Sequence, residues 1–425
     1  MNGYGIVGLN PCVHCGFCLQ SCPTYLATGD ESDSPRGRIV LIKALTEGRL
    51  PPTEQSLAHH IDRCLGCRAC ETVCPSGVEY GPALEHTRTI LAHTRSIPLT
   101  ARFVNAVLAE VRLRRPLLAL ARAARPAARA LAGNSRLGFA LGMLGATAAW
   151  PDGRRAGGPT LSRGKMRYGG VAAQRSPDTR LGILFTGCIM EGLFPHVHRA
   201  TQRTLTANGF DFAAVTSQVC CGALHAHTGQ HARALELART NVAAFAANPD
   251  AFVVVDSAGC GAMLKEYGRL LAGDPLEAEA VALSRRVQDV CELLAEAGPR
   301  EGAKIRLRVA YDPPCHLLHA QGIQEEPLQV LNSVPGLECV QPRAAELCCG
   351  SAGSYSLTET VLSRTVLTQK IATLREVEPD LVASGNPGCI MQIGAGLAAI
   401  GSEVRVVHPV EILDWSYQEA GMYDL

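Results

Sequence analysis

The cysteines of the first 80 residues constrain this chain more than any other feature. Two segments, CVHCGFCLQSCP from Cys12 and CLGCRACETVCP from Cys64, share the spacing C-x2-C-x2-C-x3-C-P. With this spacing three thiolates hold one 4Fe-4S cubane and the fourth reaches across to a second. Structural zinc also uses C-x2-C pairs, but four cysteines per motif, duplicated and closed by proline, disfavour it. The predicted ligand sets are Cys12, Cys15, Cys18 and Cys74 for cluster 1, and Cys64, Cys67, Cys70 and Cys22 for cluster 2.

A long connection separates the two motifs and contains SPRGRIVLIKALTEG, from Ser34 to Gly48. The stretch RIVLIKAL has the composition of a helix, so the motifs are expected in a helical ferredoxin module. For Arg36 and Arg38 the sequence leaves three roles open: neutralising cluster charge, docking a partner, or starting a solvated helix.

The second half of the chain contains an internal repeat. In each copy, apolar β-branched runs end just before or at a cysteine, which predicts strands that deliver cysteines from their carboxyl ends. Helical stretches follow, so we expect two α/β units with largely parallel sheets, related by pseudo-twofold symmetry. The matching segments are Leu181 to Met190 with Leu307 to Leu318, Val219 to Gly229 with Leu347 to Leu357, and Phe252 to Leu264 with Asp380 to Ile393.

Each copy of the repeat includes two adjacent cysteines followed by glycine, the triplet CCG. Adjacent cysteines do not readily form a disulfide with each other, so a repeated pair favours metal or redox chemistry. One or two further iron-sulfur clusters are therefore candidates, and sites that serve only as scaffold are the alternative. The candidate ligands are Cys188, Cys220, Cys221 and Cys260 in the first copy, and Cys315, Cys348, Cys349 and Cys389 in the second.

The predicted fold class is α+β and multidomain: a helical 2x4Fe-4S ferredoxin module followed by two pseudo-symmetric α/β CCG domains. Pro98, Pro116 and Pro126 are expected to break helices in the connector, and residues 151–170 have the composition of a flexible linker. The expected boundaries are 1–95 for the ferredoxin domain, 96–178 for the helical connector and linker, 179–300 for the first CCG domain and 301–425 for the second.

Charge and composition exclude some functions and suggest a location. Forty basic and 39 acidic residues give a net charge of +1, which argues against a nucleic-acid partner. Eighteen cysteines without an export signal suggest metal ligands in the reducing cytoplasm.

No apolar run is long enough to span a membrane. The segment from Pro116 to Trp150 is apolar and punctuated by arginines, so it is expected either to pack between domains or to contact a membrane or a membrane-bound partner.

Other polar and cysteine residues near the repeat are weaker candidates. The histidines are expected to be partly exposed loop residues, with His225 and His316 as the strongest exceptions because they are nearest to the repeat cysteines. Cys291 and Cys339 lie outside the repeat and are expected to be apolar fillers. The six histidines considered are His196, His198, His225, His227, His316 and His319.

These motifs resemble a known family. The CCG repeats are similar to the cysteine-rich domains of heterodisulfide reductase subunits and of the iron-sulfur subunits of flavin-linked 2-hydroxyacid and glycerol 3-phosphate dehydrogenases. The order of ferredoxin module and two CCG domains, with SPRGRI after the first motif, resembles the glycolate oxidase iron-sulfur subunit over nearly the whole chain. In one respect the chain departs from the pattern. Met263 and Gln392 stand where such repeats often close with a further cysteine, which argues against heterodisulfide-reductase chemistry.

The resemblance implies an electron-transfer subunit. It implies an FAD-containing partner that oxidises glycolate, and electrons that pass through the 4Fe-4S clusters to an acceptor, with quinone expected. The chain shows no G-x-G-x-x-G at a strand-helix turn, so catalytic residues are expected on the partner and none here. The alternatives are a lactate or glycerol 3-phosphate dehydrogenase subunit, an enzyme with chemistry at a CCG cluster, and a redox sensor. The expected location is cytoplasmic, with peripheral association at the inner membrane's cytoplasmic face as an extension.

Overall fold

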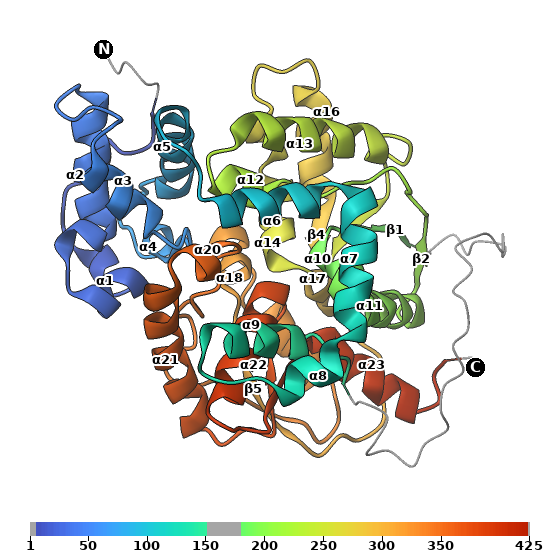
Figure 1. Ribbon diagram of the computed structural model, residues 1–425. Coiled ribbons are helices and arrows are strands. Elements are labelled where there is room, and N and C mark those ends of the chain that lie inside the picture. The colour runs from blue at the N-terminus through green and yellow to red at the C-terminus, as the bar shows by residue number, and fades with distance from the viewer. Residues whose placement is uncertain (1–5, 151–179, 424–425) are drawn as a thin grey trace.

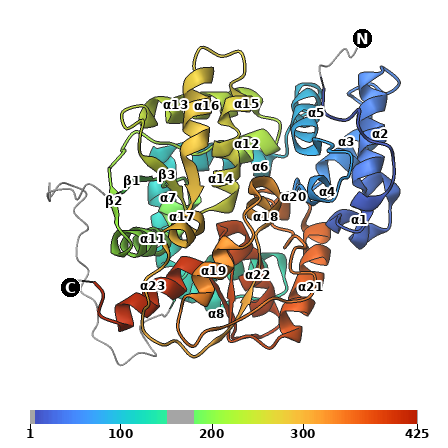
Figure 2. The ribbon, with the colours of Figure 1, turned by 180° about the vertical axis from the view of Figure 1, so that it is seen from behind.

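The computed structural model describes residues 6–150 and 180–423 (Figure 1). A helical ferredoxin module lies to one side of two α/β units, and both views place it there (Figures 1 and 2). The predicted α+β architecture of a helical module followed by two related α/β units is confirmed. The linker expected at residues 151–170 lies outside the described residues.

The ferredoxin module is built from short helices around a small apolar core. Helix α2 begins where the Ser34 side chain accepts a hydrogen bond from the Gly37 amide, with Pro35 in the first turn. Ile42 and Leu45 of α2 are fully buried in the core. The helices are α1 (Pro23–Thr28), α2 (Pro35–Thr46), α3 (Gln55–Asp62), α4 (Ala69–Thr72) and α5 (Tyr80–Thr94), with 3-10 turns η1 (Phe17–Leu19) and η2 (Glu31–Asp33).

The connector is helical and bridges both α/β units. It comprises α6 (Leu99–Ala109), α7 (Val111–Ala123), α8 (Arg125–Ala130) and α9 (Arg136–Gly145), which cross the front of Figure 1. Helix α7 packs on α10 (Ile189–Leu193) of the first unit, whereas α9 packs on α22 (Pro387–Ala399) of the second. The connector is therefore part of the packed structure.

One of the three prolines expected to break helices does not do so. Pro98 and Pro126 lie at helix starts as predicted, but Pro116 lies inside α7. The helix continues because tertiary contacts hold it on both sides of the missing hydrogen bond. Arg114 Nη2 and Arg115 Nη2 lie 2.7 and 2.9 Å from the carboxylate of Glu191 on α10.

The two α/β units have the same sheet. Each is a four-stranded parallel sheet, ordered β2-β1-β3-β4 in the first unit and β6-β5-β7-β8 in the second. Gly182 pairs with Phe212 and Phe252, and Val309 pairs in the same way with Cys339 and Leu381. The strands are β1 (Arg180–Leu184), β2 (Phe210–Phe212), β3 (Phe252–Val255), β4 (Val287–Asp289), β5 (Arg308–Tyr311), β6 (Glu338–Val340), β7 (Leu381–Ala383) and β8 (Arg405–Val407).

Helices follow the strands as the alternating sequence pattern predicts. The long helices α13 and α21 correspond to the predicted helical stretches after the CCG triplets. The first unit has α10, α11 (Pro195–Ala207), α12 (Ala223–His227), α13 (His231–Phe245), α14 (Ala258–Lys265), α15 (Tyr267–Leu270), α16 (Glu277–Arg286) and α17 (Val290–Ala297). The second has α18 (Cys315–Gln321), α19 (Glu326–Asn332), α20 (Tyr355–Thr358), α21 (Thr360–Glu376), α22 and α23 (Pro409–Glu419).

The two units share one apolar core. Buried residues of the first unit, such as Leu205, and of the second, such as Leu413, belong to the same packed cluster. Helix α23 of the second unit packs on α11 of the first, where Arg203 Nη2 lies 2.5 Å from Asp414 Oδ2. Among the described helices, none combines the length and the apolar character needed to cross a membrane.

Candidate iron-sulfur sites

The four predicted ligands of cluster 1 line a single cavity at the surface of the ferredoxin module. They come from the loop before η1, from η1 itself and from the turn after α4. Cys15 is exposed, and the other three are half-buried. A loop that curls back on itself brings them together, with His14 (φ 56°) and Gly16 (φ 88°) both in the left-handed region. Four thiols around one cavity are a donor set that suits a 4Fe-4S cluster.

The four predicted ligands of cluster 2 also lie together, but in the interior. Burial raises the pKa of the Cys70 thiol well above its ordinary value, and the nearby thiols of Cys67, Cys64 and Cys22 raise it further. Cys22 and Cys64 are buried, and the Tyr80 hydroxyl lies 3.7 Å from Cys64 Sγ, to which it donates. The eight motif cysteines thus lie around these two places, Cys70 lines the surface cavity as well, and the assignment of four ligands to each cluster stays a prediction.

Arg38 is a fully buried cation beside the second set. Its Nε donates to the His60 carbonyl at 2.7 Å and its Nη1 to Thr24 Oγ1 at 3.0 Å. Burial opposes its charge, but the thiols of Cys64 and Cys22 are among the groups that raise its pKa above the ordinary value. A buried guanidinium there offsets negative charge on thiolates. Among the three roles left open by the sequence, the geometry favours neutralisation for Arg38.

Arg36 lies in a different environment from Arg38. It is half-exposed, its Nε lies 2.5 Å from Glu31 Oε1, and its Nη1 donates to the carbonyl of His14 in the first motif at 3.4 Å. Arg36 therefore supports the loop of the first motif from the surface.

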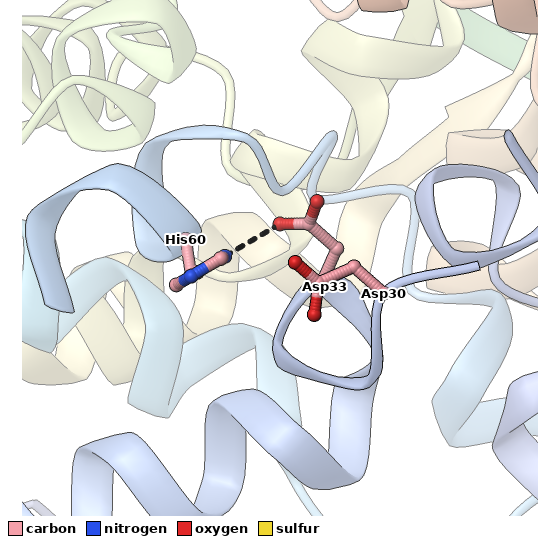
Figure 3. Close-up of side chains that lie close together, drawn as sticks. All are labelled: Asp30, Asp33 and His60. Carbon is pink, nitrogen blue, oxygen red and sulfur yellow. Dashed lines mark hydrogen bonds and ion pairs between the residues drawn. The ribbon is translucent and has the colours of Figure 1, made fainter. Parts of the chain in front are cut away.

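Figure 3 shows three side chains, Asp30, Asp33 and His60, whose oxygen and nitrogen atoms lie close enough together to hold a cation. Asp33 is fully buried and already compensated: His60 Nδ1 lies 2.9 Å from its Oδ1, and Arg63 Nη1 lies 2.6 Å from its Oδ2. Arg38 Nη2 approaches the same carboxylate at 3.4 Å. The group is therefore an ion-pair network that positions Arg38.

The first CCG site gathers its four cysteines at the carboxyl end of its sheet. Cys188 follows β1 and Cys260 lies in α14, just after β3. Cys220 Sγ lies 3.5 Å from Cys188 Sγ, and Cys221 Sγ lies 3.5 Å from Cys260 Sγ. Hydrogen bonds from Cys188 and Cys221, with one from the Gly222 amide, hold the pKa of the Cys220 thiol well below its ordinary value.

The second CCG site repeats this arrangement. Cys315 Sγ lies 4.0 Å from Cys348 Sγ, and Cys349 Sγ lies 3.4 Å from Cys389 Sγ. The pKa of the Cys348 thiol is held well below its ordinary value by its neighbours Cys315 and Cys349. Each site therefore presents four converging, mostly buried thiols with one that ionises readily, a donor set that fits an iron-sulfur cluster.

The second motif of the ferredoxin module docks on the second CCG site. Leu65 packs with Cys348 and Tyr355, and Cys67 packs against the same cluster. Burial raises the pKa of the Cys67 thiol well above its ordinary value, and Cys348 is the thiol that raises it most. A predicted ligand of cluster 2 therefore adjoins a candidate ligand of the second CCG site.

Polar contacts fix this docking. His316 Nε2 lies 3.1 Å from the Gly66 carbonyl, and the Tyr355 hydroxyl donates to the Arg63 carbonyl at 2.9 Å. Arg88 donates to the Cys64 carbonyl at 2.6 Å and to the His227 carbonyl of the first CCG unit at 3.1 Å. The cysteine-bearing loop from Cys64 to Cys70 is thus held by side chains from three parts of the chain.

The six histidines differ from the partly exposed loop residues expected from the sequence. All lie in helices, because α11, α12 and α18 follow the cysteine stations directly. His198 is buried with its Nδ1 2.7 Å from Asp256 Oδ2, and His227 Nδ1 lies 3.0 Å from Glu85 Oε1. His196 Nε2 lies 3.5 Å from Glu411 Oε1, and His319 Nδ1 lies 3.0 Å from Thr72 Oγ1.

The two histidines singled out by the sequence do lie near repeat cysteines. His225 is buried with no hydrogen-bond partner for Nδ1 among the described residues, and Cys220 is one of the groups that influence its pKa, which burial lowers. His316 contacts the ferredoxin loop. Cys291 is buried and Cys339 is half-buried, in agreement with a packing role. Sequence patterns gave no signal for the burial of Arg38 or for the role of Arg88, because both depend on contacts distant in sequence.

Replacing Arg38 tests its importance for the ferredoxin module. Arg38→Met leaves the buried Asp33 with less compensation, and breaking a buried ion pair costs about 3–5 kcal/mol. We expect a clearly lower melting temperature and reduced iron content in the anaerobically purified protein. Arg36→Met is the matched control, since half-exposed ion pairs contribute about 0–1 kcal/mol. Equal losses in both variants, measured by calorimetry and iron analysis, would contradict this role.

Comparison with known proteins agrees with the site geometry. The family model of the 4Fe-4S dicluster domain matches residues 8–78, and that of the cysteine-rich domain matches residues 183–265 and 309–394. The lactate utilization protein A of Geobacillus kaustophilus is 33% identical over 235 residues, 54% of this chain and 97% of that protein.

Two relatives extend over nearly the whole chain. The probable glycolate oxidase iron-sulfur subunit of Bacillus subtilis is 34% identical over 420 residues, covering 95% of this chain and 92% of the relative. The glycolate oxidase iron-sulfur subunit of Escherichia coli is 34% identical over 421 residues, covering 97% and 95%. With two motif cysteine sets, two cysteine-rich domains and this extent of similarity, the chain belongs to the family of glycolate oxidase iron-sulfur subunits.

Proposed function

We propose that this chain is the electron-transfer subunit of a flavin-linked glycolate or related 2-hydroxyacid dehydrogenase. An FAD-containing partner oxidises the substrate, and electrons pass through the two 4Fe-4S clusters to an acceptor, with quinone as the proposed class. The observation that carries the proposal is the placement of the two predicted ligand sets. One faces the surface and the other adjoins the second CCG site.

This placement suggests where electrons enter. Cys15 is exposed, and Val13 and Phe17 beside it have 70% and 66% of their surface accessible. Exposed apolar side chains of this size are typical of surfaces that contact a partner. The second set lies against the second CCG domain, and Cys22, Cys64 and Cys70 of that set are buried. We therefore place the flavoprotein over the loop that contains Val13 and Phe17.

The donor substrate is the second part of the proposal. The relatives that match nearly the whole chain are named for glycolate, which favours glycolate, whereas the lactate utilization proteins match about half of the chain. Since the substrate is bound by the partner, lactate and other 2-hydroxy acids remain the alternatives. We also propose the domain boundaries 1–95, 96–178, 179–300 and 301–425.

Electron entry is tested with Phe17→Glu in the complex purified with its flavoprotein. A charge at the contact should weaken docking, so we expect cluster reduction by glycolate to slow at least tenfold while reduction by dithionite is unchanged. Ile400→Glu, which changes a 49% exposed residue at the end of α22, is the control and should behave like the unmodified chain. The rate would be followed by anaerobic stopped-flow absorbance. Unchanged kinetics in Phe17→Glu would refute this entry point.

We propose further that the CCG cysteines bind iron-sulfur clusters of their own, at least in the second domain. The converging thiols and the lowered pKa values of Cys220 and Cys348 support this. The anaerobic protein should then hold more iron and acid-labile sulfide than the roughly eight atoms of each in two cubanes. Changing Cys315 and Cys349 to serine should lower both counts. Roughly eight of each in both proteins would show that the repeats are scaffold.

Peripheral membrane association is proposed for the connector. Between Ser96 and Trp150 the sequence has many arginines and a single acidic residue, Glu110. Apolar side chains on α6, α7 and α9 are exposed, among them Phe103, Leu120 and Leu137. Exposed apolar residues beside arginines suit a surface of anionic phospholipid.

Vesicle binding tests this surface. The chain should sediment with vesicles rich in phosphatidylglycerol and much less with pure phosphatidylcholine, and salt should weaken the binding. The double variant Phe103→Glu and Leu120→Glu should lose most of the binding. Val361→Glu and Ile400→Glu together, which change two exposed apolar residues elsewhere, should keep it. Equal sedimentation of the two double variants would remove the connector from the proposal.

A further inference from the structure

The two CCG sites have the same thiols but different surroundings. In each, a residue of the long following helix lies against the glycine of the CCG triplet: Ala234 of α13 against Gly222, and Ser363 of α21 against Gly350. Two turns further along these helices, the first domain has Asn241 and the second has Lys370. The duplicated position is therefore neutral in one site and cationic in the other.

Asn241 serves the backbone of the first site. It is fully buried, its Oδ1 accepts from the Val219 amide at 2.9 Å, and its Nδ2 donates to the Cys220 carbonyl at 3.1 Å. A third hydrogen bond joins Nδ2 to the Tyr267 hydroxyl at 3.0 Å. These contacts hold the CCG triplet in place and bring no charge to it.

Lys370 brings a charge to the equivalent place. It is 2% exposed, its Nζ donates to the Ala345 carbonyl at 2.7 Å, and it lies 2.8 Å from Asp312 Oδ1. Burial opposes the ammonium charge, but Asp312 and the thiols of Cys349 and Cys389 raise the pKa of Lys370 above its ordinary value. The side chain is therefore charged at neutral pH.

The groups that bind the ammonium belong to the segments that lead to two of the cysteines. Ala345 precedes Cys348 by three residues, and Asp312 precedes Cys315 by three residues. Lys370 is also among the groups that lower the pKa of Cys348, after Cys315, Cys349 and the Gly350 amide. Asp312 is also held from the other side, since its Oδ2 accepts from the Ser384 hydroxyl at 2.9 Å. The pair is therefore buried between the segments that lead to Cys315 and Cys348.

The first site has a buried cation of another origin. Neighbouring Cys220 and burial raise the pKa of the Cys188 thiol, and Arg114 from the connector lowers it. The Arg114 side chain also forms an ion pair with Glu191. Arg114 comes from outside the first CCG unit, whereas Lys370 lies on the helix that follows the CCG triplet of its own unit.

A fixed buried cation favours the form of a thiolate-bound cluster that carries the additional negative charge. In the low-dielectric interior this raises the reduction potential. We propose that Lys370 is the potential-setting residue of the second CCG site, where it raises the reduction potential of the iron-sulfur group held by Cys315, Cys348, Cys349 and Cys389. This inference rests on the proposed cluster of that domain. It makes the domain that adjoins Cys67 a favourable destination for electrons leaving the ferredoxin module.

The experiment is an EPR-monitored redox titration of the anaerobic, full-length chain. The EPR signal of the second site is identified with two variants. It should disappear in Cys349→Ser, which changes the second site, and remain in Cys221→Ser, which changes the first. Lys370→Gln alone would leave Asp312 buried without its cation, so the informative variant combines Lys370→Gln with Asp312→Asn and keeps the pair neutral. We expect its midpoint potential to shift to a more negative value, while both ferredoxin signals stay at their potentials.

Two controls separate charge from structure. Lys370→Arg keeps the cation and should restore most of the midpoint potential, which a role in packing alone does not predict. Asn241→Gln changes the equivalent buried position of the first site and should leave the second-site signal unmoved. An unchanged midpoint in the neutral pair variant, or an equal shift of the ferredoxin signals, would overturn the proposal.

The remaining outcome concerns the cluster itself. If no signal and no iron depend on Cys349, the second site holds no cluster and this proposal is wrong. Reduction of the two ferredoxin clusters by glycolate and the flavoprotein would still be observed in that case. The failure of this inference is therefore distinguishable from the failure of the proposed electron-transfer function.

Discussion

The contact between the loop from Cys64 to Cys70 and the second CCG site is the interaction on which the rest of the arrangement depends. It covers one predicted ligand set, brings Cys67 against Cys348, and leaves the set that contains Cys15 as the one that faces the surface. A loop that carries three thiolates has few apolar side chains of its own to bury. Its position is fixed instead by hydrogen bonds from Arg88 and His316 to carbonyl groups of the loop, and from Tyr355 to the preceding carbonyl of Arg63.

Much of this structure could be predicted from local patterns. The C-x2-C-x2-C-x3-C-P spacing predicts four ligands for each cluster because the wrap around a cluster is set by neighbouring residues. The repeat predicts the two sheets because the apolar runs before Cys188, Cys260, Cys315 and Cys389 are buried strands. Those features need no information from distant parts of the chain. The strand expected before each CCG triplet is wrong, since both triplets follow loops.

What the sequence could not predict depends on contacts between distant segments. Two similar repeats give no reason why the second, and not the first, receives the ferredoxin loop. Arg38 looks like a residue at a solvated helix start until Asp33 and the His60 carbonyl enclose it. Pro116 looks like a helix breaker until Glu191 anchors the two preceding arginines. The boundary near residue 300 separates the repeats in sequence, yet α11 and α23 join them in one core.

The two duplicated sites have the same scaffold but differ in their buried charged pairs. Both units bury a carboxylate directly after a strand that leads to a candidate cysteine, but on different strands: Asp256 follows β3 in the first unit, and Asp312 follows β5, the counterpart of β1, in the second. The partners differ as well. Asp256 pairs with His198, whose charge depends on a proton that imidazole gives up readily, whereas Asp312 pairs with Lys370, whose charge is permanent at neutral pH. A chain of redox sites needs such inequality, because identical sites in identical surroundings would give electrons no preferred way to move.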